Sequence, residues 1–156
     1  MAWAKNGTVT GVSQSLTGLT AYKFNQILNH VIDNGSAIDV DLRIDNISTN
    51  TYAYRESDDG STDATATEQA EITLDDTSAA TERFSVVYGI NIAAEEKLFI
   101  GFVIDASTAG AATAPSRVEV VGKQSGTSNA WTRLDILETG AGAFTSDSNL
   151  TALGTD

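Results

Sequence analysis

The densest group of possible metal ligands in this chain is the segment 58–63, Asp-Asp-Gly-Ser-Thr-Asp. Asp58, Asp59 and Asp63, with neighbouring hydroxyl groups, offer the hard oxygen ligands that calcium prefers. Their spacing does not match the Asp-x-Asp-x-Asp-Gly order of an EF-hand, and a loop whose Asp and Ser side chains cap their own backbone explains the same residues. We therefore expect no metal and no cofactor, and these three aspartates are the candidates should calcium bind.

Residues that could perform hydrolysis are few. His30 is the one histidine of the chain, and no serine stands in a Gly-x-Ser-x-Gly setting. Asp39 and Asp41 alternate along one predicted strand and could serve glycoside hydrolysis only with a further carboxylate about 5 to 10 Å away. A solvated strand face balanced by Arg43 explains them as well, so we expect no enzyme.

Exposed aromatic side chains on a β-sandwich can stack against sugars. Tyr52 and Tyr54 lie two residues apart and therefore on one face of a strand. They are the candidate glycan platform, and a carbohydrate-binding module of a tail fibre or secreted protein is the alternative function. Packing in the core or in an interface explains the same two rings.

Composition excludes several classes of protein. The chain has 156 residues, a formal net charge of -12 and no cysteine, with 41% hydrophobic and 19% charged residues. The absence of cysteine removes disulfides and thiolate chemistry, and the negative charge opposes binding to nucleic acid. No segment approaches the roughly 18 apolar residues of a membrane-spanning helix, and the start lacks the apolar block of a secretory signal. We expect a protein that is made in a cytoplasm and either stays there or leaves it by lysis or assembly, with no nucleic acid or membrane partner.

Strand patterns run through the chain. Ile38, Val40, Leu42 and Ile44 alternate with Asp39, Asp41 and Arg43, which predicts a half-exposed strand. The segment 22–32 fits either a strand or one short helix, and we favour the strand. Segment 57–67 has the composition of a polar loop, whereas 98–104 is apolar on both faces and predicts a central strand.

These patterns predict an all-β protein, an antiparallel two-sheet sandwich of jelly-roll-like type with about 8–10 strands and at most one short helix. Residues 1–20 are rich in Thr, Ser and Gly and are expected to form an N-terminal arm with a possible edge strand. Residues 21–156 are expected to form a single β-sandwich domain. The low-complexity segment 106–116 contains the one proline and predicts an exposed loop.

Several short motifs resemble a known class of proteins. They are Leu-Thr-x-Tyr-Lys-Phe from Leu19, Asp-Leu-Arg-Ile from Asp41, Tyr-Ala-Tyr-Arg from Tyr52, Asp-Gly-Ser-Thr from Asp59, and Gly-x-Phe-x-x-x-Ser-x-Leu-x-x-Leu-Gly from Gly142 to Gly154. In this layout the chain resembles small β-sandwich proteins of bacteriophage virions, especially head-decoration and tail-associated structural proteins.

The resemblance implies a structural protein of a phage particle, most of all a capsid decoration protein that stabilises the shell through protein–protein contacts. Its partners would be the major capsid protein or another virion protein and copies of itself, as a homo-oligomer. It would be assembled into the virion in the host cytoplasm. The interface candidates come from the arm and the low-complexity loop: Trp3, Val9, Val12, Ala111 and Pro115.

Overall fold

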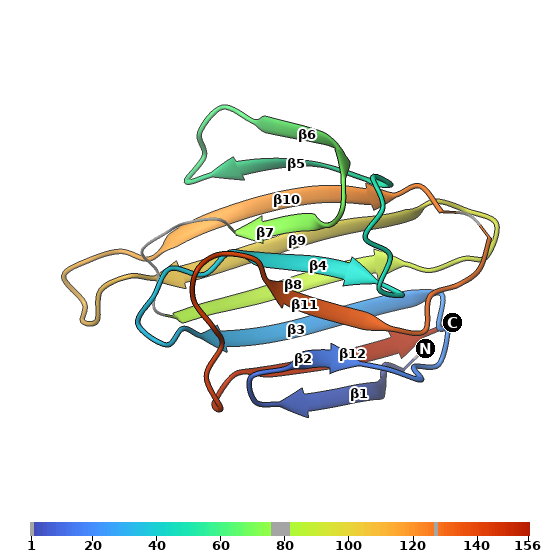
Figure 1. Ribbon diagram of the computed structural model, residues 1–156, viewed down its shortest axis with the longest axis horizontal. Helices are drawn as coiled ribbons and strands as arrows, with labels where there is room; N and C mark the ends of the chain where they lie inside the picture. The colour runs from blue at the N-terminus through green and yellow to red at the C-terminus, as the bar shows by residue number, and fades with distance from the viewer. Residues whose placement is uncertain (1, 76–81, 127) are drawn as a thin grey trace.

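Apolar residues at every second position allow the strands of this chain to pack as two layers (Figure 1). The structure, a computed structural model, describes residues 2–75, 82–126 and 128–156. The larger layer is an eight-stranded sheet, in the spatial order β1 (Ala4–Thr10), β12 (Asn149–Thr155), β3 (Phe24–Ile32), β8 (Glu82–Ile90), β9 (Lys97–Ala106), β10 (Ser116–Gln124), β5 (Tyr52–Asp58) and β6 (Ala64–Gln69).

The smaller layer covers one face of the large sheet (Figure 1). It has four strands, in the order β2 (Gln14–Leu16), β11 (Leu134–Glu138), β4 (Val40–Ile44) and β7 (Ile72–Asp75). The neighbouring strands in both sheets pair antiparallel. The expected all-β sandwich is therefore confirmed.

Details of the predicted layout differ from the structure. The described residues form twelve strands and no helix, so residues 24–32 of the ambiguous segment 22–32 form a strand, β3. Residues 64–67, expected at the end of a polar loop, belong instead to edge strand β6, because the backbone of this segment pairs with β5 although it offers little apolar surface. The division into eight and four strands leaves the jelly-roll topology unconfirmed. Residues expected to form an arm supply an edge strand to each sheet, β1 and β2.

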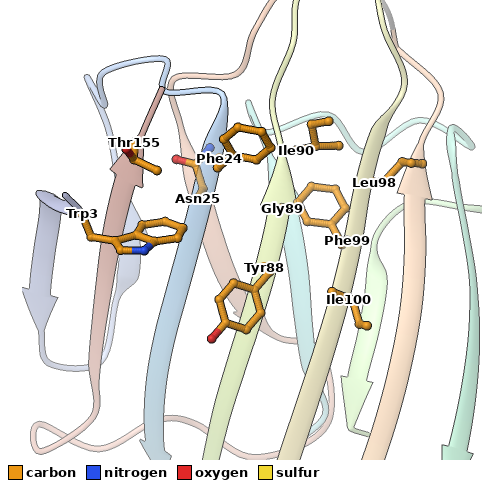
Figure 2. Close-up of a pocket in the computed structure, with 10 residues that line it drawn as sticks. All are labelled: Trp3, Phe24, Asn25, Tyr88, Gly89, Ile90, Leu98, Phe99, Ile100 and Thr155. Carbon is orange, nitrogen blue, oxygen red and sulfur yellow. The ribbon is translucent and has the colours of Figure 1, made fainter. Parts of the chain in front are cut away.

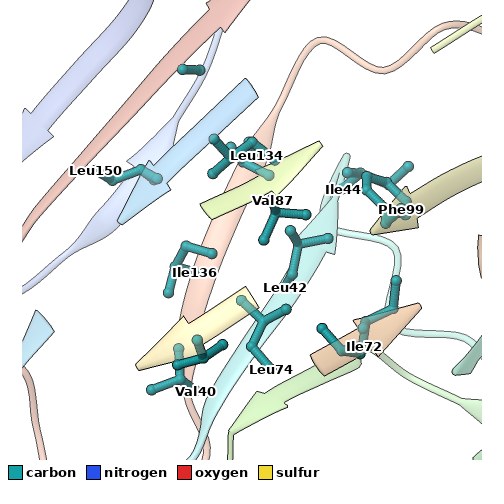
Figure 3. Close-up of a cluster of buried hydrophobic side chains, with 14 of the residues drawn as sticks. Val40, Leu42, Ile44, Ile72, Leu74, Val87, Phe99, Leu134, Ile136 and Leu150 are labelled. Carbon is teal, nitrogen blue, oxygen red and sulfur yellow. The ribbon is translucent and has the colours of Figure 1, made fainter. Parts of the chain in front are cut away.

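The core lies between the two sheets. Leu42 of β4 and Leu74 of β7 face Val87 of β8 across the sandwich, and all three are buried (Figure 3). A buried ion pair between Asp75 of β7 and Arg83 of β8 also connects the layers. Burial of apolar area is the main stabilising contribution in a chain without disulfides.

Both edges of the large sheet are irregular. In the pairing of β1 with β12, the register shifts between Lys5 and Gly7. In the pairing of β5 with β6, it shifts between Tyr52 and Tyr54, and Glu68 of β6 has a positive φ of 58°. Such bulges locally increase the twist of a strand and interrupt its hydrogen-bonding pattern.

Candidate functional site

The acidic loop between β5 and β6 is held by its own hydrogen bonds. Asp59 and Gly60 have positive φ values of 48° and 76°, and the Ser61 amide donates to the Asp58 carbonyl at 2.8 Å, which makes a tight turn. The Asp59 carboxylate accepts from the backbone amide of Arg117 at 3.0 Å, and the Asp63 carboxylate pairs with Arg55.

These contacts engage the carboxylates of Asp59 and Asp63 with donors from the protein itself. Within the described parts of the chain, no group of three or more His, Cys, Asp or Glu residues is placed to hold a metal ion. The arrangement is that of a capped turn.

His30 lies on β3 beside Glu82 of β8. Its Nε2 is 2.8 Å from the Glu82 carboxylate on the surface of the large sheet. In the register of β3 and β8, His30 lies opposite Phe84 and Glu82 lies opposite Ile32, so the contact is a diagonal cross-strand pair on the sheet surface. This contact gives His30 a structural role.

Asp41, expected on a solvated strand face, is buried. Its carboxylate accepts a hydrogen bond from the Thr139 hydroxyl, and the side chain is only 2% exposed. Burial raises the pKa of Asp41 to about 6, although hydrogen bonds from Thr139 and Thr73 oppose this rise. The half-exposed strand predicted at 38–44 is therefore wrong at Asp41, because residues of β7 and of the segment after β11 cover it.

The outer face of the small sheet is polar throughout its centre. Arg43 of β4 pairs with Glu71, and the buried Asp135 of β11 accepts hydrogen bonds from Arg133 and Ser15. These pairs provide hydrogen-bond partners for polar side chains on this face. The outer surface of the small sheet is therefore lined by polar and charged side chains that pair with one another.

The two tyrosines of the predicted glycan platform point toward the small sheet. Tyr52 is 1% exposed, and its hydroxyl bonds with the backbone N–H and C=O of Ile44. Tyr54 is half-buried, and its hydroxyl donates to the Thr73 hydroxyl at 3.0 Å. The two rings do not form the exposed pair that a sugar platform would need, because the face of β5 that they share is covered by β7.

The outer face of the large sheet is different in kind. Along β9, every second residue from Lys97 to Asp105 is buried against the small sheet, while Leu98, Ile100, Phe102 and Ile104 point away from it and are about half exposed. A strand apolar on both faces is typical of a sheet that is covered on both sides. Here one of the two sides is open.

The neighbouring strands extend this apolar surface. On β8, Phe84 and Tyr88 are 44% and 42% exposed, and Val121 of β10 is 48% exposed. We call these residues, together with the four of β9 and the nearby Phe24 and Trp3, the outer apolar face. Nine large apolar side chains that each keep 42% to 52% of a surface of roughly 200 Å² expose on the order of 800 Å².

A hollow of about 440 Å³ lies at one end of this face (Figure 2). The rings of Trp3, Phe24 and Tyr88 surround it together with Leu98 and Ile100. The indole of Trp3 extends over β12 and β3 from the segment before β1, as Figure 2 shows. The hollow is therefore an apolar depression in the sheet surface with aromatic walls.

Charged residues beside the outer apolar face are paired with one another. Arg55 lies 3.1 Å from Asp63, and Lys123 lies 3.0 Å from Glu96. Arg117 lies 3.9 Å from Glu119, and its exposed charge therefore also has a partner within the same surface. The whole chain has a formal net charge of -12, whereas this surface combines these three Lys/Arg–carboxylate pairs with Glu82, which lies next to His30.

The structure brings only some of the predicted interface residues to this face. Trp3 lines the hollow, and Pro115 lines a separate depression together with Phe102 and Ile104. Val9 packs against the core instead, since its side chain points inward from edge strand β1. Val12 is 67% exposed in the bend between β1 and β2, and Ala111 is exposed in the loop between β9 and β10.

Sequence reasoning missed the outer apolar face itself. The signal was present in the segment 98–104, whose apolar residues at consecutive positions predicted a central strand. That strand is central, as the fifth of eight in its sheet. The pattern alone does not indicate whether the protein layers on the two faces of such a strand belong to the same chain.

Comparisons with known proteins add little. No family model matches this chain, and no curated protein matches it. Among solved structures, the chain is similar to the CBM2 module of evolved Dit of Lactobacillus casei BL23 phage J-1. The identity is 10% and the TM-score is 0.27, with 96% of this chain and 69% of that chain covered. At this TM-score the similarity supports no argument about fold or function.

Proposed function

We propose that this protein is a non-catalytic structural protein of a phage particle, and that it acts as a capsid decoration protein through protein–protein contacts. The observation that supports contact as its mode of action is the outer apolar face. Its exposed area of about 800 Å² exceeds the 300–600 Å² of the largest apolar patch on a typical monomer, and it matches one side of a standard protein interface. The phage particle is suggested by the sequence motifs that resemble virion proteins.

The position of charged and polar groups favours a protein as the partner of this face over a sugar. Sugar sites combine aromatic rings with several free hydrogen-bonding groups, whereas the hollow adds Asn25, Thr155 and the Tyr88 hydroxyl to its apolar walls, and that hydroxyl already accepts from the Gln26 amide at 3.0 Å. The Asn25 amide already donates to the Tyr22 carbonyl at 2.9 Å. Apolar side chains of another protein fit such a lining better than a hydroxylated ring.

The contact with the shell would come from the exposed parts of the chain outside this face. The loop between β9 and β10 is exposed from residue 107 to Pro115, and it contains Ala111. In this proposal the loop meets the major capsid protein, and the assembled particle is where the protein resides.

Quantitative mass spectrometry of purified particles tests the proposal. Particles of the virus that encodes this chain should contain the protein in a fixed ratio close to that of the major capsid protein. A few copies per particle would overturn decoration and place the protein in the tail, while its absence from particles would overturn a structural role altogether. A variant tests the proposed contact with the shell. Protein in which residues 107–114 are replaced by Gly and Ser should not rebind to shells from which the wild-type protein has been removed.

A further inference from the structure

We propose that the outer apolar face is covered by the same face of a second copy of this chain, so that two sandwiches pack large sheet against large sheet. This proposal rests on the proposed function only in treating the face as a protein interface. It adds the identity of the partner. The argument uses the area of the face, the balance of its charges and the geometry of two identical sheets.

The area is sufficient for a stable dimer. A standard interface buries about 800 Å² on each partner, and the outer apolar face exposes on the order of 800 Å² of apolar side chain. Its centre is the row Leu98, Ile100, Phe102 and Ile104 on β9, flanked by Phe84 and Tyr88. A cluster of aromatic and aliphatic residues at the centre of a patch is the composition of an interface core.

The charge distribution allows two acidic copies to meet there. Each copy has a formal net charge of -12, which favours separation over long distances. Three of the nine Lys and Arg residues of the chain, Arg55, Arg117 and Lys123, nevertheless lie on or beside this face and pair with its carboxylates. The face thus carries paired charges of both signs, together with Glu82 beside His30, so apolar contact between two copies is opposed less there than the net charge of the whole chain implies.

A second copy also matches the shape of the face. Two sheets of the same twist stack at about 10 Å with their strands about 30° apart. A twofold axis through the face brings the same residues to both sides, so the apolar row on β9 meets an apolar row and the charged pairs meet at the margin. Phe102 stands in the middle of that row and would lie at the centre of the interface.

Analytical ultracentrifugation of wild-type and variant protein tests this proposal. The wild-type protein should have about twice the chain mass of 16.3 kDa at micromolar concentration. Phe102→Asp and Ile104→Asp should each raise the dissociation constant about 100-fold or more, because each places a charge in the apolar centre. Val12→Asp is the matched control, since it adds the same charge to a more exposed apolar residue outside the face, and it should remain dimeric.

A second measurement does not depend on these charged variants folding. The chain has no cysteine, so Ile100→Cys and Val12→Cys each introduce a single thiol. At concentrations that favour the dimer, a maleimide should label the cysteine of Ile100→Cys at least about 10-fold more slowly than that of Val12→Cys, and dilution should remove the difference.

A monomeric wild-type protein at about 100 µM, or a dimer that tolerates both charged variants, would overturn the proposal. The result is separable from the proposed function. A monomer that joins shells and loses this ability in Phe102→Asp would assign the face to a capsid protein, and a dimer absent from particles would overturn only the structural role in the virus.

Discussion

Replacing Asp41 with asparagine removes the titration of a carboxyl that the fold holds almost out of contact with water. In the folded protein the pKa of Asp41 is raised from 3.8 to about 6, mainly by burial. The folded state therefore binds a proton more tightly than the unfolded state does. The contribution of Asp41 to stability is greatest below pH 3.8 and is lost as the pH rises through 6. At about 1.4 kcal/mol for each pKa unit, this loss amounts to about 3 kcal/mol.

Urea unfolding of wild-type and Asp41→Asn protein between pH 3.5 and 7 measures this contribution. The free energy of unfolding of the variant minus that of the wild type should rise by up to about 3 kcal/mol across this range, with most of the rise between pH 4 and 6. Any constant cost of fitting an amide against Thr139 cancels in this comparison. Asp147→Asn, at an exposed carboxylate, is the matched control and should show no comparable rise. A difference for Asp41→Asn that stays constant with pH would refute the reasoning.

Three further substitutions test the packing. Trp131→Ala should lower the free energy of unfolding by about 3 to 5 kcal/mol, because the indole is 1% exposed; a loss under 1 kcal/mol in urea titration would contradict this. Tyr52→Phe should cost about 1 to 2 kcal/mol, since its hydroxyl bonds both backbone groups of Ile44, and an unchanged melting temperature would contradict it. Gly154→Ala should cost about 1 to 3 kcal/mol, because the new Cβ would lie 2.1 Å from the Tyr22 ring; if so, Tyr22→Ala should relieve most of the clash in a double-mutant cycle.

The residues of the closing motif explain why a short pattern could suggest a protein class without giving a site. Phe144 is buried in the core, and the Ser148 hydroxyl accepts from the Ile32 amide at 3.0 Å. Leu150 is fully buried, and Gly154 lies directly under the Tyr22 ring. Each of these residues holds the end of the chain against β3 or the core. The motif is therefore a packing signature.

Periodicity predicted strands well and burial less well. The alternation from Ile38 to Ile44 correctly gave a strand, but Asp41 is covered by Thr139, which is 98 residues away in the sequence. In the same way, spacing placed Tyr52 and Tyr54 on one face of β5, while only the position of β7 decides that this face is the inner one. Local pattern fixes which residues share a face, and contacts distant in sequence decide what covers it.

For β9, in contrast, the sequence predicted burial of both faces, and the structure buries one of them. Its two apolar faces could be recognised in the sequence, and the central position of the strand is confirmed. The four strands of the small sheet, however, cover only one side of the large sheet. The local sequence pattern therefore predicts a strand that is covered on both faces, but it does not indicate which chain supplies the second covering layer.

The bulges at the two edges of the large sheet have a consequence for how copies of this protein can accumulate. A long, regular edge strand would accept the backbone of another molecule, and repetition of that step leads to fibrils. The register shifts at Lys5 and Gly7 and at Tyr52 and Tyr54 interrupt both edges at which such growth would begin. In the proposed dimer, association through one sheet face would stop at two copies. A chain with a broad apolar surface can in this way reach high local concentration without polymerising into cross-β aggregates.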